Sequence, residues 1–303
     1  MRNRPIENRP QAASLPYFRR CSFAALLGLA VVAALPQPQQ PDLPNTLTAI
    51  SKQASQFWQS APNFTAHETL EQRFIVRRHP RLHIHLSPPP RGPQYRQRTL
   101  QCWYGFTTLR DAPEALVEVR DPSAREALEQ ALAASDRRKR ELIHRFEHDN
   151  SRGLAMDVGQ IILLFTRARV DQYSFQVTRT ATLASDPVWV IIFHQKTGDA
   201  SLRIQEPGHS LRAPVQGELW VRQSDQLVLR ITLMNSRQDG KIAIRDEATV
   251  DYAPNPVTAV LPSVATYRRY LNERLYFENI SHYADWQPVP TRSLPRSPRP
   301  DAA

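Results

Sequence analysis

The chain has 303 residues, a formal net charge of +10 and two cysteines. More than half of the charge excess lies near the ends, because residues 1–20 carry five Arg and one Glu and residues 286–303 carry three Arg and one Asp. The body has no Lys/Arg stripe with interleaved aromatic residues, which argues against a nucleic-acid groove. With about 250 residues, the body is long enough to bury a core without disulfides.

The N-terminal segment has the order of features found in secretory signals. Basic residues up to Arg20 precede an uncharged apolar run at residues 21–35, and a Pro/Gln-rich stretch follows at residues 36–44. A signal peptide combines a basic region, an apolar region of roughly 7–15 residues and a small-residue site, whereas a membrane span needs about 20 apolar residues. We therefore predict that residues 1–35 are a signal peptide or, if retained, an N-terminal anchor in contact with the inner membrane. Residues 36–44 are predicted to be a linker, and the protein to be exported to the periplasm or cell envelope.

Apolar residues with a helical period predict an amphipathic helix directly after this linker. The stripe consists of Leu47, Ile50, Ala54, Phe57 and Trp58. Asn45 or Thr46 would cap the helix, and Pro62 would end it. In residues 64–76 the apolar side chains then recur at alternate positions, which predicts the first strand of a sheet.

The middle of the chain changes from strand to helix and back. Strands are predicted at residues 95–106 and 116–120, after a proline-rich break at residues 88–93. Residues 121–150 are predicted to be a helical insertion, with Ser123 and Glu126 spaced as a capping box. A polar interruption at residues 135–140 would split this insertion into two helices, and a short buried helix is expected at residues 161–165.

The last third of the chain predicts an antiparallel sheet. Alternation restarts at Tyr173, Phe175 and Val177, and further strands are expected at residues 188–193, 216–223, 227–234, 242–252 and 275–283. Apolar residues recur there at every second position, whereas charged residues such as Arg230, Arg245 and Asp251 take the alternate positions. One face of the sheet is therefore expected to be buried against the core and the other to be exposed to solvent. The tail, residues 286–303, contains five prolines and is expected to be disordered.

One short motif is compatible with catalysis. His144, Glu147 and His148 have the H-x-x-E-H spacing that puts two zinc ligands and a general base on one helical face. An exposed, ion-paired helix end explains the same residues, and a packed free cysteine explains Cys102. The sequence contains neither a Gly-rich phosphate loop nor a G-x-S-x-G elbow. We therefore expect no catalytic residues, no resident metal and no cofactor, with a zinc-dependent hydrolase as an alternative.

Aromatic residues in the predicted strands suggest a ligand-binding hollow. An ordinary packed core would use them as well, and sequence patterning does not separate the two, because ligand pockets are themselves mostly apolar. The candidate lining residues of an apolar cavity are Phe64, Phe74, Trp103, Phe175, Trp189, Phe193 and Trp220.

Three segments together resemble the LolA-like superfamily of periplasmic lipoprotein carriers and their relatives. These are Asn63-Phe-Thr-Ala-His-Glu-Thr-Leu-Glu-Gln, then Gly217-Glu-Leu-Trp-Val-Arg-Gln, and finally Leu261-Pro with Tyr276-Phe-Glu-Asn-Ile-Ser-His-Tyr. The chain is more similar still to a group of uncharacterised exported bacterial proteins in which such a barrel carries an inserted helical segment like residues 121–150. LolA itself is shorter and lacks the insertion, and Arg222 and Gln223 stand where an acid is often found.

The resemblance implies a mainly β (α+β) domain at residues 45–285. Its strongly curved antiparallel sheet would form an unclosed β-barrel with helices in its concavity. The function expected from it is binding or carrying a lipid or other apolar molecule in the cell envelope. The alternative from another class is a non-catalytic structural or interaction module of an envelope complex, which would use its sheet edge or its proline-rich tail to bind a protein partner. We expect no nucleic-acid partner.

Overall fold

The computed structural model describes residues 41–76, 93–150, 158–196, 202–206 and 209–290, apart from the side chains of residues 113–115, 147–150 and 202–213. The helices are α1 (Leu43–Ser60), α2 (Arg125–Leu132) and α3 (Asp136–Asn150), with 3₁₀ turns η1 (Ala61–Asn63), η2 (Ile161–Phe165) and η3 (Val170–Gln172). The strands are β1 (Phe64–Ile75), β2 (Tyr95–Leu109), β3 (Ala112–Asp121), β4 (Tyr173–Leu183), β5 (Asp186–Gln195), β6 (Leu202–Glu206), β7 (His209–Ala213), β8 (Gln216–Arg222), β9 (Val228–Asp239), β10 (Ile242–Asn255), β11 (Ala259–Leu271) and β12 (Arg274–Pro288).

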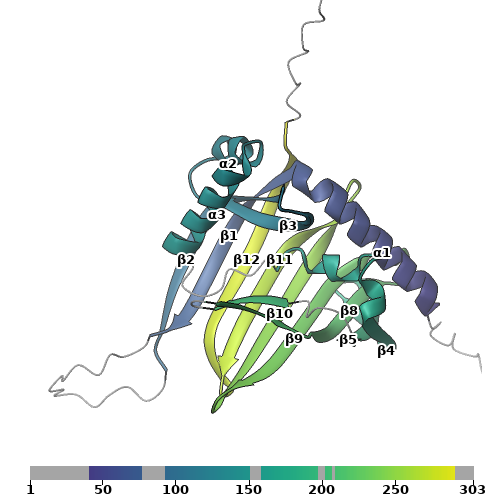
Figure 1. Ribbon diagram of the computed structural model, residues 1–303. Coiled ribbons are helices and arrows are strands. Elements are labelled where there is room, and N and C mark those ends of the chain that lie inside the picture. The colour runs from purple at the N-terminus through teal and green to yellow at the C-terminus, as the bar shows by residue number, and fades with distance from the viewer. Residues whose placement is uncertain (1–40, 77–92, 151–157, 197–201, 207–208, 291–303) are drawn as a thin grey trace, which may run out of the picture. The chain divides into compact units, whose positions relative to one another are not determined.

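Ten strands form one antiparallel sheet in the order β3-β2-β1-β12-β11-β10-β9-β8-β5-β4. Because β3 and β4 are its two edges, the sheet is not closed into a barrel, and β6 and β7 pair separately as a hairpin. In Figure 1 the long strands curve, and α1 lies across their upper ends. This arrangement confirms the predicted fold class, an unclosed and curved antiparallel sheet with helices against its inner face.

The strand register divides the side chains between the two faces of the sheet. On the inner face, Leu219 of β8 lies beside Ile231 of β9, which lies beside Val250 of β10. All three are fully buried, in one cluster with apolar residues of α1 and η2. The alternate positions belong to the outer face, where Arg230 and Asp251 are partners and form an ion pair. The period of two therefore predicted the correct face for these strands.

Helix α1 packs on the sheet through the predicted stripe, in which Ile50 and Phe57 are fully buried. Trp58 was predicted to belong to this stripe, but it is exposed. Its N-cap is Asp42, whose carboxylate accepts a hydrogen bond from the backbone N–H of Asn45. The predicted caps at Asn45 and Thr46 are therefore wrong. Pro44 in the first turn, where its missing N–H costs no hydrogen bond, is the signal for the earlier start.

The helical insertion packs around the β3 edge of the sheet and splits into α2 and α3, as expected. Leu128 of α2 is fully buried in a cluster with Val119 of β3. Phe146 of α3 instead packs with Leu70 of β1, which belongs to the inner face. The predicted capping box is absent, because the N-cap residue is Ala124 and makes no side-chain hydrogen bond.

Three strands were missed by the sequence analysis, namely β6, β7 and the central strand β11. Pro262 interrupts the alternation of β11, and it is tolerated because the β10–β11 register shifts beside it, between Asp251 and Tyr252. The neighbouring strand, β12, continues to Pro288, past the expected boundary at residue 285. There the indole Nε1 of Trp286 donates a hydrogen bond to the backbone oxygen of Pro262 at 2.9 Å.

The predicted signal or anchor at residues 1–35 and most of the predicted tail lie outside the described residues. In the ranges that the structure does describe, no helix combines the length and the apolar character needed to cross a membrane.

Candidate functional site

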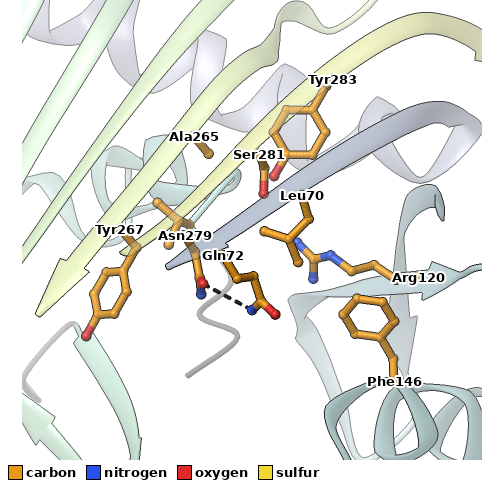
Figure 2. Close-up of a pocket in the computed structure, with 10 residues that line it drawn as sticks. Leu70, Gln72, Arg120, Phe146, Ala265, Tyr267, Asn279, Ser281 and Tyr283 are labelled. Atoms are coloured by element: carbon orange, nitrogen blue, oxygen red, sulfur yellow. Dashed lines mark hydrogen bonds between the residues drawn. The ribbon is translucent and has the colours of Figure 1, made fainter. Parts of the chain in front are cut away.

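A pocket lies on the inner face of the sheet, over β1, β12 and β11 (Figure 2). Its polar lining consists of Gln72, Arg120, Tyr267, Asn279, Ser281 and Tyr283. Its apolar lining consists of Leu70, Phe146, Val158 and Ala265. The sheet supplies eight of these ten residues, whereas Phe146 comes from α3 and Val158 from the segment before η2. The pocket therefore combines polar and apolar groups in one buried place.

Two small side chains explain why a hollow exists at this point. Ala265 of β11 and Ser281 of β12 are partners in the strand register, whereas the next inward positions hold Tyr267 and Tyr283. The cavity volume is ≈ 20 Å³, room for about one ordered water molecule. Small-molecule sites commonly have about 300–1,000 Å³, so the pocket is nearly closed in this conformation.

Arg120 forms one wall of the pocket and is held by two carboxylates. Its Nε donates a hydrogen bond to Glu68 Oε2 at 2.6 Å, and its Nη2 donates to Glu68 Oε1 at 3.1 Å and to Glu118 Oε2 at 2.8 Å. Arg120 is 7% exposed and Glu68 is fully buried. Burial alone would lower the pKa of Arg120, but the charges of Glu68 and Glu118 raise it well above its ordinary value. The guanidinium is therefore permanently charged and fixed in position.

A row of polar side chains crosses the inner face of the sheet beside the pocket, and several of them are joined by hydrogen bonds. Arg98 Nε donates to Gln72 Oε1 at 2.6 Å, and Gln72 Nε2 donates to Asn279 Oδ1 at 3.1 Å. Tyr267 lies beside Asn279 in the register, and its hydroxyl donates to Asp246 Oδ1 at 2.6 Å. These residues occupy inward positions of neighbouring strands, so the strand register brings them together.

Two tyrosines and one cysteine in or beside the pocket are held in their protonated forms. Burial is the main cause that raises the pKa of Tyr267 and of Tyr283 well above the ordinary value. Burial likewise raises the pKa of Cys102, whose Sγ donates to Glu68 Oε2 at 3.2 Å. Because only the thiolate is a strong nucleophile, Cys102 is unreactive at neutral pH, which agrees with its prediction as a packed cysteine.

The seven aromatic residues predicted to line an apolar cavity are divided between the two faces of the sheet. Five belong to the main inner cluster or pack against it, namely Phe64, Phe74, Phe175, Trp189 and Phe193. Trp103 packs instead with the cluster that α2 and α3 form on β3. Trp220 lies on the outer face, between the guanidinium groups of Arg179 and Arg230 at 5.5 and 5.7 Å. None of the seven lines the pocket, so their contact with a ligand stays a prediction.

The zinc motif falls partly outside the described residues. His144 is exposed on α3, but the side chains of Glu147 and His148 belong to the undescribed set. Among the side chains that the structure describes, no group of three His, Cys, Asp or Glu residues is placed to hold a metal ion. The zinc-hydrolase alternative therefore remains a hypothesis based on spacing alone.

Sequence reasoning missed the residues that line the pocket, although one signal was available. The alternation of the first strand puts Leu70 and Phe74 on its inward face, and the same period puts Glu68 and Gln72 there. Polar groups at inward positions need buried partners. Glu68 and Gln72 were therefore detectable as members of a buried polar cluster, but their partners were not.

Comparisons with known proteins give only distant similarities. No protein-family model matches the chain, and no curated protein matches it. A DUF1329 family protein from Desulfovibrio piger is 10% identical, with 82% of this chain and 95% of that chain covered and a TM-score of 0.33. A LolA superfamily protein from Nitrosomonas europaea is 11% identical, with 82% and 94% covered and a TM-score of 0.31. Superpositions with TM-scores this low assign no ligand and no partner to this chain.

Proposed function

We propose that this chain is a binding or carrier protein of the cell envelope, without a catalytic centre, that takes a lipid or another amphiphile at the inner-face pocket. The observation that carries the proposal is the mixed lining of that pocket. Buried polar groups of Arg120 and Gln72 lie in one hollow with Leu70 and Phe146. An amphiphile has a polar group for the first pair and an apolar part for the second.

Binding requires the pocket to enlarge, because ≈ 20 Å³ does not hold a lipid. Most of the lining belongs to strands that are fixed by backbone hydrogen bonds to their neighbours. Phe146 is the large apolar lining residue that comes from a helix, α3, instead of from the sheet. In our proposal Phe146 moves aside, and its contacts with Leu70 are replaced by the apolar part of the ligand. Burial of that part would contribute about 25 cal/mol per Å².

The aromatic residues predicted from the sequence extend the proposed apolar surface beyond the pocket. Phe74 follows Gln72 by two positions on β1 and shares its inward face. Phe175, Trp189 and Phe193 belong to the same inner face near the other edge of the sheet. An acyl chain lying along this face would leave the polar group of the ligand near Arg120.

Extraction of bound lipid from the full chain, purified from cells and analysed by mass spectrometry, tests the proposal. We expect a lipid to copurify with the wild type and to be lost in Ala265→Leu, which fills the pocket. The matched control is Thr266→Leu, the next residue of β11, which points to the outer face. Thermal melts of both variants show whether they remain folded. If the wild type yields no lipid and binds no apolar fluorophore, the proposal fails.

A second candidate function, an interaction module of an envelope complex, is favoured by the edge strand β4. This strand is 11 residues long and contains neither Pro nor Lys, two of the residues that commonly protect sheet edges. A partner strand could therefore add to it. Thr180→Pro on β4 should release a copurified partner, whereas deletion of residues 286–303 should release it if the tail is the contact. Retention of the partner in both variants counts against this function.

A further inference from the structure

The polar groups of the pocket differ in whether their hydrogen-bonding atoms are already used. The hydroxyl of Tyr267 donates a hydrogen bond to Asp246 Oδ1 at 2.6 Å, and both polar atoms of the Gln72 side chain already form hydrogen bonds. Arg120 uses Nε and Nη2 for its carboxylate partners, but its Nη1 makes no hydrogen bond with any residue that the structure describes. A guanidinium has two N–H donors on that atom. Arg120, which lines the pocket, therefore has unused donors.

The positive charge of Arg120 is already neutralised by carboxylates, although its Nη1 donors have no hydrogen-bond acceptor among the described residues. Glu68 faces it in a bidentate pair, and Glu118 accepts a further hydrogen bond from Nη2. Both carboxylate side chains are fully buried. A third anion would bring another negative charge into this buried group, at a large desolvation cost. A neutral acceptor would satisfy Nη1 without that cost.

The guanidinium is also held in one orientation. Its central carbon lies 5.0 Å from the ring centroid of Tyr104 and 5.5 Å from that of Phe146. The bidentate contact with Glu68 fixes the plane of the group, since Nε and Nη2 both point at that carboxylate. Nη1 is therefore oriented before any ligand arrives, which lowers the entropic cost of a hydrogen bond to it.

We infer that Arg120 selects a ligand whose polar group is an uncharged hydrogen-bond acceptor, such as the carbonyl of an ester or amide, over a ligand with a carboxylate or phosphate. The inference rests on the proposed function and names the class of ligand that the pocket takes. Arg120 Nη1 donates to the carbonyl oxygen, and the apolar part of the ligand lies against Leu70 and the space that Phe146 vacates.

Three probes with hydrocarbon chains of the same length separate these possibilities in a fluorophore-displacement titration of the full chain. Monolaurin presents a neutral ester carbonyl, lauryl glyceryl ether has the same glycerol but no carbonyl, and laurate presents a carboxylate. We expect monolaurin to bind at least roughly tenfold more tightly than the ether, the value of one hydrogen bond from a charged donor. Laurate should also bind more weakly than monolaurin.

The outcomes separate this inference from the proposed function. Equal binding of monolaurin and the ether, or tightest binding of laurate, overturns the inference while leaving a lipid-binding protein. Failure of all three probes to displace the fluorophore overturns both. The wild-type ranking alone decides these cases, so the test does not depend on a variant.

A variant pair assigns the preference to Arg120. Arg120→Lys retains a cation for Glu68 but removes the guanidinium donors, and we expect it to bind monolaurin and the ether equally. Arg137→Lys is the matched control, because Arg137 lies on α3 with a side chain that is 89% exposed. An unchanged preference in a folded Arg120→Lys variant contradicts the assignment.

Discussion

Arg120 of β3 and Glu68 of β1 form a bidentate ion pair although strand β2 lies between their strands. The guanidinium therefore reaches across the inner side of β2, where Cys102 and Tyr104 of that strand contact the pair. Side-chain contacts therefore connect β1, β2 and β3, in addition to the backbone hydrogen bonds between these strands. It also places a fixed charge beside the only small inward pair on β11 and β12 that lines the pocket, Ala265 and Ser281.

Removal of the Glu68 charge should destabilise the fold strongly. In Glu68→Gln the buried guanidinium of Arg120 loses its bidentate partner, and breaking such a pair from one side costs about 3–5 kcal/mol. The control is Glu71→Gln on the exposed outer face of the same strand, with an expected effect within about 0.5 kcal/mol. Urea unfolding of both variants measures the difference. Equal midpoints would show that the pair contributes little.

Much of the sheet was predictable because its strands follow one local rule. In β9 and β10 most inward positions are apolar, as at Ile231, Leu233 and Val250, so the faces could be assigned from the sequence. Strand β11 breaks that rule twice, at Pro262 and at the buried Arg269, whose Nε donates to Asp246 Oδ1 at 2.6 Å. A buried arginine looks like a solvent-facing one in the sequence until its partner on another strand is known.

The candidate site was not predictable for a topological reason. Glu68 and Gln72 lie on the first strand, but Asn279 and Ser281 lie on the last, and these strands are neighbours. Chain order does not reveal that β1 pairs with β12, nor that Arg120 reaches Glu68 across β2. Local patterning marks which side chains point inward, whereas the identity of their partners depends on the strand order.

Gly217 of β8 should tolerate no side chain. A Cβ at this position would lie 1.9 Å from the backbone oxygen of Thr232 on β9, which no rotamer change can relieve. Gly217→Ala must therefore shift β8 away from β9, and we expect a loss of more than about 3 kcal/mol, beyond the range of ordinary substitutions. Thermal unfolding with circular dichroism measures it.

Gly240→Asn is the matched control for Gly217→Ala. Gly240 has φ +55 in the β9–β10 turn, and a Cβ there meets nothing within 4 Å. Asparagine accepts this left-handed conformation better than other residues, so the variant should lose less than about 1 kcal/mol. A Gly217→Ala protein as stable as Gly240→Asn contradicts the close approach of β8 and β9.

Gln53 of α1 should anchor the helix to the sheet. Its Nε2 donates to the backbone oxygen of Gln226 at 2.7 Å, and its Oε1 accepts from the backbone N–H of Val228 at 3.0 Å. Gln53→Leu leaves both backbone groups without these partners, at a cost of about 1–3 kcal/mol. Gln59→Leu, at an exposed position of the same helix, is the control. Guanidinium unfolding compares the two, and similar midpoints would argue against the anchor.

Alkaline pH should unfold the protein through its buried tyrosines. Burial is the largest cause that raises the pKa of Tyr104, Tyr252, Tyr267 and Tyr283 above the ordinary value of 10.0. Because the folded state favours their neutral form, their contribution to stability is complete below pH 10.0. As the pH rises above that value, the unfolded chain releases protons that the folded chain retains. The free energy of unfolding then falls by about 1.4 kcal/mol per pH unit for each such tyrosine.

The measurement that checks this fall is a spectroscopic titration, because tyrosinate formation and unfolding report different events. The chain has nine tyrosines. We expect the tyrosinate absorbance of the four named above to appear only together with the loss of the β-sheet circular dichroism signal. In urea at the same pH all nine should titrate as in a free peptide, which supplies the reference amplitude. Complete titration near pH 10.0 with the sheet signal intact would contradict the prediction, since it would require the four hydroxyls to reach water in the folded state. A delayed and cooperative step would instead show that the aromatic interior beside the pocket stays dry until the sheet unfolds.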